Sequence, residues 1–264
     1  MNLVLDRMPD LMPLSLKALG SARRKPRPEV ELPKMSVALA SVSFDAARLA
    51  AYREICGFDE GAGVPILYPQ VHAIGLQMHL LTQPQFPLPL VGLVHLKNHI
   101  VQERPLGADE HFEARVGVIG QRASDKGLEF DLETTYTDAG GAVPWKAVAT
   151  VLHRRKQPEK KKGPRPPEDG GLAEYHAIDA PTDIGRRYGR ISGDMNPIHL
   201  YPLTARLLGF QRHIAHGMWS LARCCSRRWD GRPLSSRSSS ASRCSCRARP
   251  RCATAATAKA VPSR

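Results

Sequence analysis

The side chains best suited to chemistry lie between Tyr188 and His199, in the stretch YGRISGDMNPIH. An acid, Asp194, stands five positions before an imidazole, His199. A carboxylate beside an imidazole can activate water and move a proton near neutral pH. The pair therefore indicates proton-transfer chemistry on a small molecule.

The residues around Asp194 predict a rigid turn rather than a regular element. Gly193 permits a backbone conformation that a side chain forbids, Asn196 favours turns, and Pro197 fixes the chain. The poor hydrophobic periodicity of this stretch argues against a plain core helix or strand. We expect a short helix after it, ending near Gly209.

A second candidate element is HIAHGMWSLARCC, which runs from His213 to Cys225. His216 and Gly217 stand where an apolar helix is expected to begin. Free N–H groups at a helix N-terminus attract anionic oxygen, and a glycine lets a carbonyl oxygen approach closely. The two elements together suit proton chemistry next to a thioester or a similar carbonyl.

Simpler interpretations of these residues remain open. The sequence Asp-Met-Asn-Pro is commonly a turn or a helix cap, and a histidine before a glycine is often structural. Metal binding by His199, His213 and His216 is conceivable, but these residues lack helical i/i+4 spacing and a paired thiolate. We therefore predict no metal site, and the residue types alone leave catalysis and a structural role equally open.

The first half of the chain has an α+β pattern. SVALASVSFDAARLAAYREICGF predicts a strand followed by a short helix, and YPQVHAIGLQMHLLTQ, residues 68–83, predicts a buried helix. Alternating apolar residues between about 90 and 153 then predict four strands. A sheet that wraps around a helix satisfies this order.

The chain then repeats part of this pattern. YREICGF at 52–58 aligns with YGRISGD at 188–194, and a helix start follows both. This similarity indicates an internal duplication. Phe58 stands where the second copy has Asp194, and nothing in the first copy matches NPIH, so only the second copy carries the candidate chemistry.

Residues 188–205, YGRISGDMNPIHLYPLTA, together with GFQRHIAHGM at 209–218, resemble the signature of the MaoC-like dehydratases, the (R)-specific enoyl-CoA hydratase family. The first half resembles the non-catalytic unit of two-unit members. This resemblance implies a double hotdog fold, in which each unit is a helix wrapped by an antiparallel sheet.

The resemblance also implies roles for the candidate residues. Asp194 and His199 would activate water, which adds to C3 of a trans-2-enoyl thioester while a proton reaches C2 on the same face. The Gly217 N–H would hold the enolate oxygen, and supporting roles would fall to Ser192, Gly193, Asn196 and His216. No metal or redox cofactor is implied, because the CoA or acyl carrier arm arrives with the substrate.

The expected organisation has five parts: a lead-in (1–34), a non-catalytic hotdog unit (35–156), a basic Pro/Gly linker (157–172), the start of a catalytic hotdog unit (173–225) and a basic tail (226–264). The tail has few large apolar residues, so we predict that it is disordered. Its Arg, Ser, Ala, Cys and Pro content favours a frameshift product over a natural terminus. The second unit is then truncated, its helix exposes an apolar face, and the activity of this exact chain is open.

The charge distribution bears on possible partners. Of the formal net charge of +13, His153–Pro167 contributes +6 and residues 226–264 contribute +9, which leaves −2 for the remainder. Because the folded regions are close to neutral, we predict no nucleic-acid partner. No window approaches the roughly 18 apolar residues of a membrane span, so we expect no membrane partner and a cytoplasmic protein.

The functional prediction is a hydro-lyase of fatty-acyl metabolism that acts on acyl thioesters and forms a homodimer by analogy with the fold. The alternative is a non-catalytic protein that binds acyl thioesters or serves in assembly.

Overall fold

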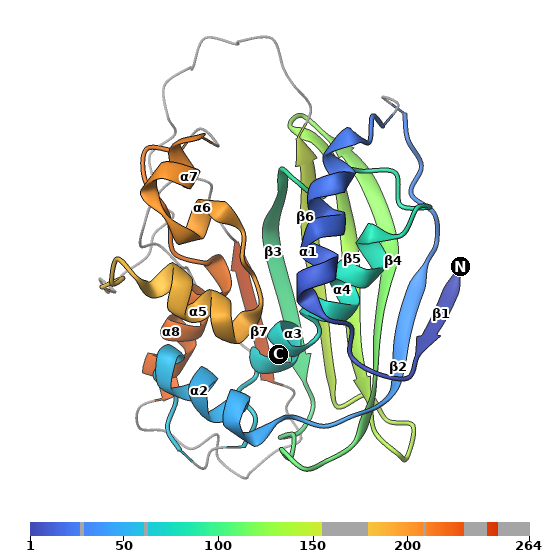
Figure 1. Ribbon diagram of the computed structural model, residues 1–264. Helices are drawn as coiled ribbons and strands as arrows, with labels where there is room; N and C mark the ends of the chain where they lie inside the picture. Colours follow the sequence, from blue (N-terminus) through green and yellow to red (C-terminus); the bar gives the residue numbers. More distant parts are fainter. Residues whose placement is uncertain (27–28, 61–62, 155–178, 208–209, 230–241, 248–264) are drawn as a thin grey trace.

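The computed structural model describes residues 1–26, 29–60, 63–154, 179–207, 210–229 and 242–247 (Figure 1). The elements of the first half are β1 (Asn2–Leu5), α1 (Leu11–Gly20), the 3-10 helix η1 (Ser21–Arg23), β2 (Ser36–Val42), α2 (Ala46–Cys56), α3 (Tyr68–His72), α4 (Ile74–Thr82), β3 (Leu93–Gln102), β4 (Phe112–Ser124), β5 (Gly127–Thr137) and β6 (Trp145–Arg154). The second half supplies α5 (Ile184–Ser192), α6 (Pro197–Leu200), α7 (Pro202–Leu207), α8 (Gly217–Trp229) and β7 (Ser242–Arg247).

The seven strands form one sheet in the order β1-β2-β4-β5-β6-β3-β7. The pairing of β1 with β2 is parallel, and all other neighbours are antiparallel. Alternate residues of β5 and β6 face inward, so Phe130, Leu132, Tyr136 and Trp145 are buried. The α3–α4 segment lies against this face and contributes Leu76 and Leu80 to the same core. The predicted α+β architecture, a helix wrapped by an antiparallel sheet, is confirmed.

The predicted helix over 68–83 is divided at Ala73 into α3 and α4. The side chains on this segment are buried against an aromatic cluster. His72 Nδ1 lies 2.8 Å from the Tyr136 hydroxyl, which itself donates to the Pro69 carbonyl at 3.0 Å. The His72 ring thus receives a fixed place in the core.

The lead-in is folded onto the first unit. β1 extends the sheet beyond β2, and α1 packs against α4. The boundary predicted between residues 34 and 35 therefore separates residues that the structure packs together. No periodicity within residues 1–34 predicts this packing, because the partner surface is built from distant residues.

Arg24 fastens the lead-in to the end of α4. Its guanidinium donates to four backbone carbonyls at and beyond that helix end, those of Leu81, Thr82, Gln83 and Leu88, at 2.9–3.1 Å. The carbonyls at a helix C-terminus have no partner within the helix, and a positive charge there is favourable.

We expect Arg24→Ala to lower the free energy of unfolding by about 2 kcal/mol, because partly buried carbonyls lose charged donors. Urea denaturation measures the change. Arg23→Ala, which removes an exposed arginine next to it, is the control and should alter stability by less than about 0.5 kcal/mol. Equal stability of the two variants would show that the contacts of Arg24 are dispensable.

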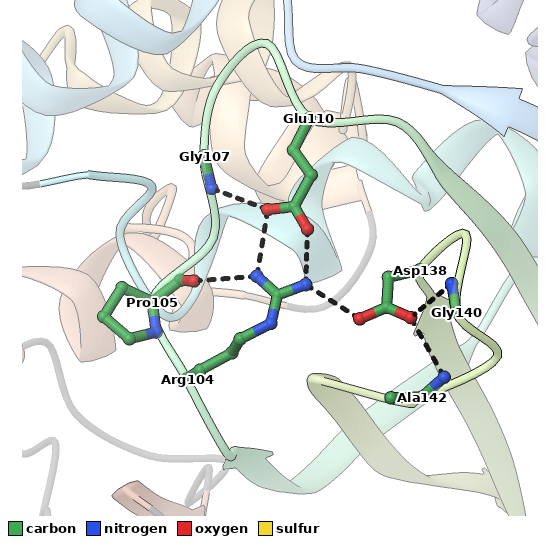
Figure 2. A network of polar contacts seen from close by, with 7 residues as sticks. All are labelled: Arg104, Pro105, Gly107, Glu110, Asp138, Gly140 and Ala142. Carbon is green, nitrogen blue, oxygen red and sulfur yellow. Dashed lines mark hydrogen bonds and ion pairs between the residues drawn. The ribbon is translucent and has the colours of Figure 1, made fainter.

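A polar network closes one end of the sheet (Figure 2). Arg104, just after β3, donates to Glu110 in the connection to β4 and, at 2.9 Å, to Asp138 just after β5. The guanidinium lowers the pKa of both carboxyl groups. The network therefore ties two loops of the sheet together.

The second unit packs on the first through helices. The Trp219 indole on α8 donates to the carbonyl of Ile55 on α2 at 2.9 Å. Trp219, Leu221 and Ala222 are all buried. The prediction that this helix exposes an apolar face is therefore wrong, because α2 of the first unit covers part of it.

The predicted tail, residues 226–264, contains two described stretches. α8 continues to Trp229, and β7 pairs antiparallel with β3 from Lys97–Arg247 to Gln102–Ser242. For these stretches the prediction of disorder is wrong, because the edge of β3 offers backbone donors and acceptors to another strand whatever its side chains. The rest of the tail, the linker at 157–172 and Gly209 lie outside the described residues.

No helix among the residues that the structure describes combines the length and the apolar character needed to cross a bilayer.

Candidate active site

The turn predicted around Asp194 begins at the C-terminus of α5. Gly193 has a left-handed backbone with φ of 82° and caps the helix. The Asp194 N–H then donates to Ser192 Oγ at 3.2 Å, and Asp194 Oδ1 accepts from the Asn196 N–H at 3.1 Å. The carboxylate is therefore held by its own turn while its side chain stays 40% exposed.

The same turn begins α6 and places His199. The Asn196 side chain accepts from the Ile198 N–H at 3.3 Å, which caps α6, and Pro197 occupies the first helical position. His199 is buried, and its Nδ1 donates to the Ile214 carbonyl at 2.8 Å. A carbonyl can only accept, so this bond leaves Nε2 as the basic nitrogen of the neutral ring.

His216 completes a compact group with these two residues. Its Nε2 donates to the Asp194 carbonyl at 2.9 Å and lies 3.8 Å from Asp194 Oδ2. The rings of His199 and His216 stack with centroids 3.8 Å apart and an interplanar angle of 29°. The fold thus brings together three side chains that are spread over 23 positions of sequence.

Burial keeps both imidazoles neutral. It lowers the pKa of His199, and the nearby charge of Asp194 only partly opposes this effect. Burial also lowers the pKa of His216 to about 4, and the neighbouring His199 adds to the shift. At neutral pH the site therefore holds uncharged imidazole bases next to a carboxylate.

Stability should depend on pH through the buried histidines. Burial lowers the pKa of His72, like that of His216, to about 4, from an ordinary value of 6.5. Between pH 6.5 and 4 the unfolded chain binds more protons than the folded chain, so stability is lost as the pH falls. We expect His72 and His216 each to contribute on the order of 3 kcal/mol to this loss of unfolding free energy.

Urea denaturation at a series of pH values between 7.5 and 4.5 measures this dependence. His72→Gln should remove the part of this dependence that comes from His72, and it leaves the histidines of the candidate site in place. A variant with the full pH dependence would show that His72 stays protonatable in the folded protein.

Gly217, the first residue of α8, is exposed, and the space where a side chain would stand is open. Its backbone N–H belongs to the first turn of the helix, where N–H groups have no carbonyl partner within the helix. This N–H follows directly on His216 in the chain. It is placed to polarise a carbonyl oxygen beside the acid–base group.

Two glycines make the geometry possible. A Cβ on Gly185 would lie 1.7 Å from the His199 carbonyl oxygen, so α5 and the His199 backbone approach each other only because this residue has no side chain. A Cβ on Gly193 would lie 2.0 Å from Leu11 on α1. The lead-in therefore covers the turn that carries Asp194.

The donor set also bears on metal binding. One ligand atom from each of Asp194, His199 and His216 lies within 4.8 Å of the others. One nitrogen of each imidazole is already bonded to a backbone carbonyl, that of Ile214 for His199 and that of Asp194 for His216. His213 stands apart from the group, because its Nε2 is bonded to the Thr182 carbonyl at 2.8 Å.

The first unit supports the site in ways that the motif does not reveal. Arg48 on α2 donates to the carbonyls of Ile191, at 2.8 Å, and Ser192, at 3.4 Å, just before Gly193. His95 on β3 feels the charge of Asp194, which opposes the lowering of the pKa of His95 by burial. The sequence signal for such support is a polar residue at an inward-facing position of a strand. Recognising that position requires the register of β3 against β6.

The internal duplication is visible in the same region. Gly57 ends α2 with φ of 72°, as Gly193 ends α5. Arg223 on α8 donates to the Cys56 carbonyl, as Arg48 does to the matching Ser192. At the position of Asp194 the first copy has Phe58, whose ring stacks on Tyr52, so this end of the first unit is apolar.

Comparison with known proteins agrees with this geometry. Residues 171–228 match the family model of the MaoC like domain. The chain is 34% identical over 212 residues to 3-hydroxyacyl-thioester dehydratase X of Mycobacterium tuberculosis, covering 78% of this chain and 73% of that protein.

Solved structures give the same result. The crystal structure of HtdX from M. tuberculosis matches with a TM-score of 0.64 and 32% identity, over 80% of this chain and 81% of that one. A MaoC-like dehydratase from Phytophthora capsici matches with a TM-score of 0.57 and 20% identity, over 82% and 80% of the two chains, which shows the shared fold.

Proposed function

We propose, because the chain belongs to the MaoC-like dehydratase family, that it hydrates trans-2-enoyl thioesters and dehydrates (R)-3-hydroxyacyl thioesters in fatty-acyl metabolism. The curated relative is named as a dehydratase of 3-hydroxyacyl thioesters. The observation that carries the proposal is the convergence of Asp194, His199 and His216 beside the N-terminus of α8.

The reaction uses three groups of this chain. His199 Nε2 and the Asp194 carboxylate hold and deprotonate a water molecule, whose oxygen bonds to C3 of the enoyl group. The C2–C3 double bond becomes single, and the proton is delivered to C2 on the same face. General acid–base catalysis of this kind contributes about 10²–10⁴-fold in rate.

The Gly217 N–H stabilises the negative charge that develops on the thioester oxygen when the bond to C3 forms. The helix dipole of α8 acts in the same direction. The turn is held by Ser192, Gly193 and Asn196. His216 orients Asp194 by donating a hydrogen bond to the Asp194 backbone carbonyl. The proposal requires no metal or redox cofactor, because the activating thioester is carried by the substrate.

The remaining parts of the proposal concern partners and location. A CoA or acyl carrier thioester is the substrate, and a homodimer in the cytoplasm is the working assembly. The net formal charge of −2 that remains outside His153–Pro167 and residues 226–264 supports the absence of a nucleic-acid partner.

The test is hydration of crotonyl-CoA by the purified 264-residue chain, followed by the loss of enoyl absorbance and by chiral analysis of the product. The proposal expects the (R)-3-hydroxybutyryl thioester. Binding of acyl-CoA without turnover would instead support the alternative, a non-catalytic acyl-thioester-binding protein.

A further inference from the structure

The inner face of β3 carries polar side chains where apolar ones are expected. Asn98 pairs with Ala149 of β6, and Gln102 pairs with Trp145. Both β6 residues are buried, and paired residues of neighbouring strands point to the same face. A polar side chain on such a face is unfavourable unless it is hydrogen-bonded.

Asn98 has only one of its expected partners. It is 3% exposed, and its Nδ2 donates to the Met218 sulfur at 3.5 Å, a weak acceptor. Its Oδ1 is buried and has no hydrogen-bond partner in the described part of the chain. Reversing the carboxamide would leave the nitrogen unpaired instead of the oxygen, so one end of the Asn98 amide lacks a partner in either orientation.

The position of Asn98 connects it to the candidate active site. Met218 follows Gly217, the residue proposed to hold the thioester oxygen. His95, on the same inner face of β3, lies close enough to Asp194 to feel its charge. The unpaired oxygen of Asn98 is thus adjacent to the start of α8, on the side that the first unit supplies.

We infer that Asn98 Oδ1 accepts a hydrogen bond from the amide N–H of the cysteamine end of the pantetheine arm, an inference that rests on the proposed function. This N–H is two methylene groups from the thioester sulfur in both CoA and acyl carrier substrates. The thioester group itself has no hydrogen-bond donor, and the C3 hydroxyl of the hydrated form is bound by Asp194 and His199. Asn98 is therefore a substrate-binding residue contributed by the non-catalytic unit.

Two synthetic crotonyl thioesters test the inference. One carries N-acetylcysteamine, and the other carries a 4-oxopentyl group, in which a methylene replaces the N–H while the carbonyl stays in place. We expect the natural chain to show a kcat/KM about tenfold higher for the first, since the second leaves Oδ1 unpaired. Equal use of the two thioesters by the natural chain overturns the inference without any substitution.

Asn98→Leu removes the acceptor at similar volume and should process the two thioesters equally. Gln102→Leu is the matched control, because it removes a second amide from the same inner face, and it should keep the preference. A preference that persists in Asn98→Leu would assign the N–H to another acceptor and would overturn the inference.

Binding of the saturated butyryl forms of the same two thioesters, measured by ligand-observed NMR, separates this inference from the proposed function. Neither compound can be hydrated. An Asn98-dependent preference of about tenfold in Kd supports the inference even if crotonyl thioesters are not turned over. Hydration without any preference in binding or turnover refutes the inference alone.

Discussion

Replacing Asp194 by Asn lowers the kcat for crotonyl-CoA hydration about a thousandfold, within the range attributed to one acid–base group. Asparagine has the same shape and can still accept from the Asn196 N–H, so the turn is retained. It cannot accept a proton from water. The loss should therefore appear in kcat, measured from the decrease in enoyl absorbance, while the thermal unfolding midpoint is unchanged.

The control for this result is Asp183→Asn, at the position just before α5. Asp183 makes no side-chain cap bond to the helix, so its substitution removes an acid from the same segment without touching the turn. It should leave both kcat and stability unchanged. Retention of activity in Asp194→Asn would remove Asp194 from the mechanism, and retention in His199→Ala as well would place hydration elsewhere.

Gly185→Ala should inactivate the site without changing any group that does chemistry. The new Cβ would overlap the His199 carbonyl oxygen at 1.7 Å and crowd the attached carbon at 2.7 Å. Both contacts are with backbone, so α5 and α6 must separate, and His199 then leaves its place against His216. A misplacement of about 1 Å costs roughly a hundredfold in rate, and the overpacking costs about 1–3 kcal/mol of stability.

Gly20→Ala provides the comparison for this substitution. Gly20 also lies in a helix, but a Cβ there meets nothing within 4 Å. The change should be neutral or stabilise the protein by up to about 1 kcal/mol, since alanine has the higher helix propensity. Steady-state kinetics and urea denaturation of both variants form the experiment. A fully active Gly185→Ala protein would show that α5 can shift without moving His199.

The candidate site could be predicted from sequence to the extent that it is local. Asp194, Asn196 and His199 are joined by one turn, and Gly193, Asn196 and Pro197 each specify a backbone conformation by their own chemistry. His216 and Gly217 were found because a helix start is also a local signal. The helix over 68–83 and the four following strands were found for the same reason, because periodicity depends only on neighbours in the chain.

The contacts that join distant segments required the tertiary structure. The stacking of His199 on His216 and the bonds from Arg48 to the end of α5 depend on how two units pack, and no spacing in the sequence encodes that packing. The packing of residues 1–34 against the first unit was not predicted for the same reason. Leu11 of this lead-in covers Gly193 across more than 180 positions of sequence.

The sequence by itself determined which residues could do chemistry and what kind of fold would carry them, because turns, caps and periodicity are properties of short segments. Only the tertiary structure decided which polar residues of the first unit face the site. Asn98 and His95 belong to an ordinary strand by their pattern. Their importance follows from the register of β3 against β6 and from the contact with α8, which are set by packing across the whole chain.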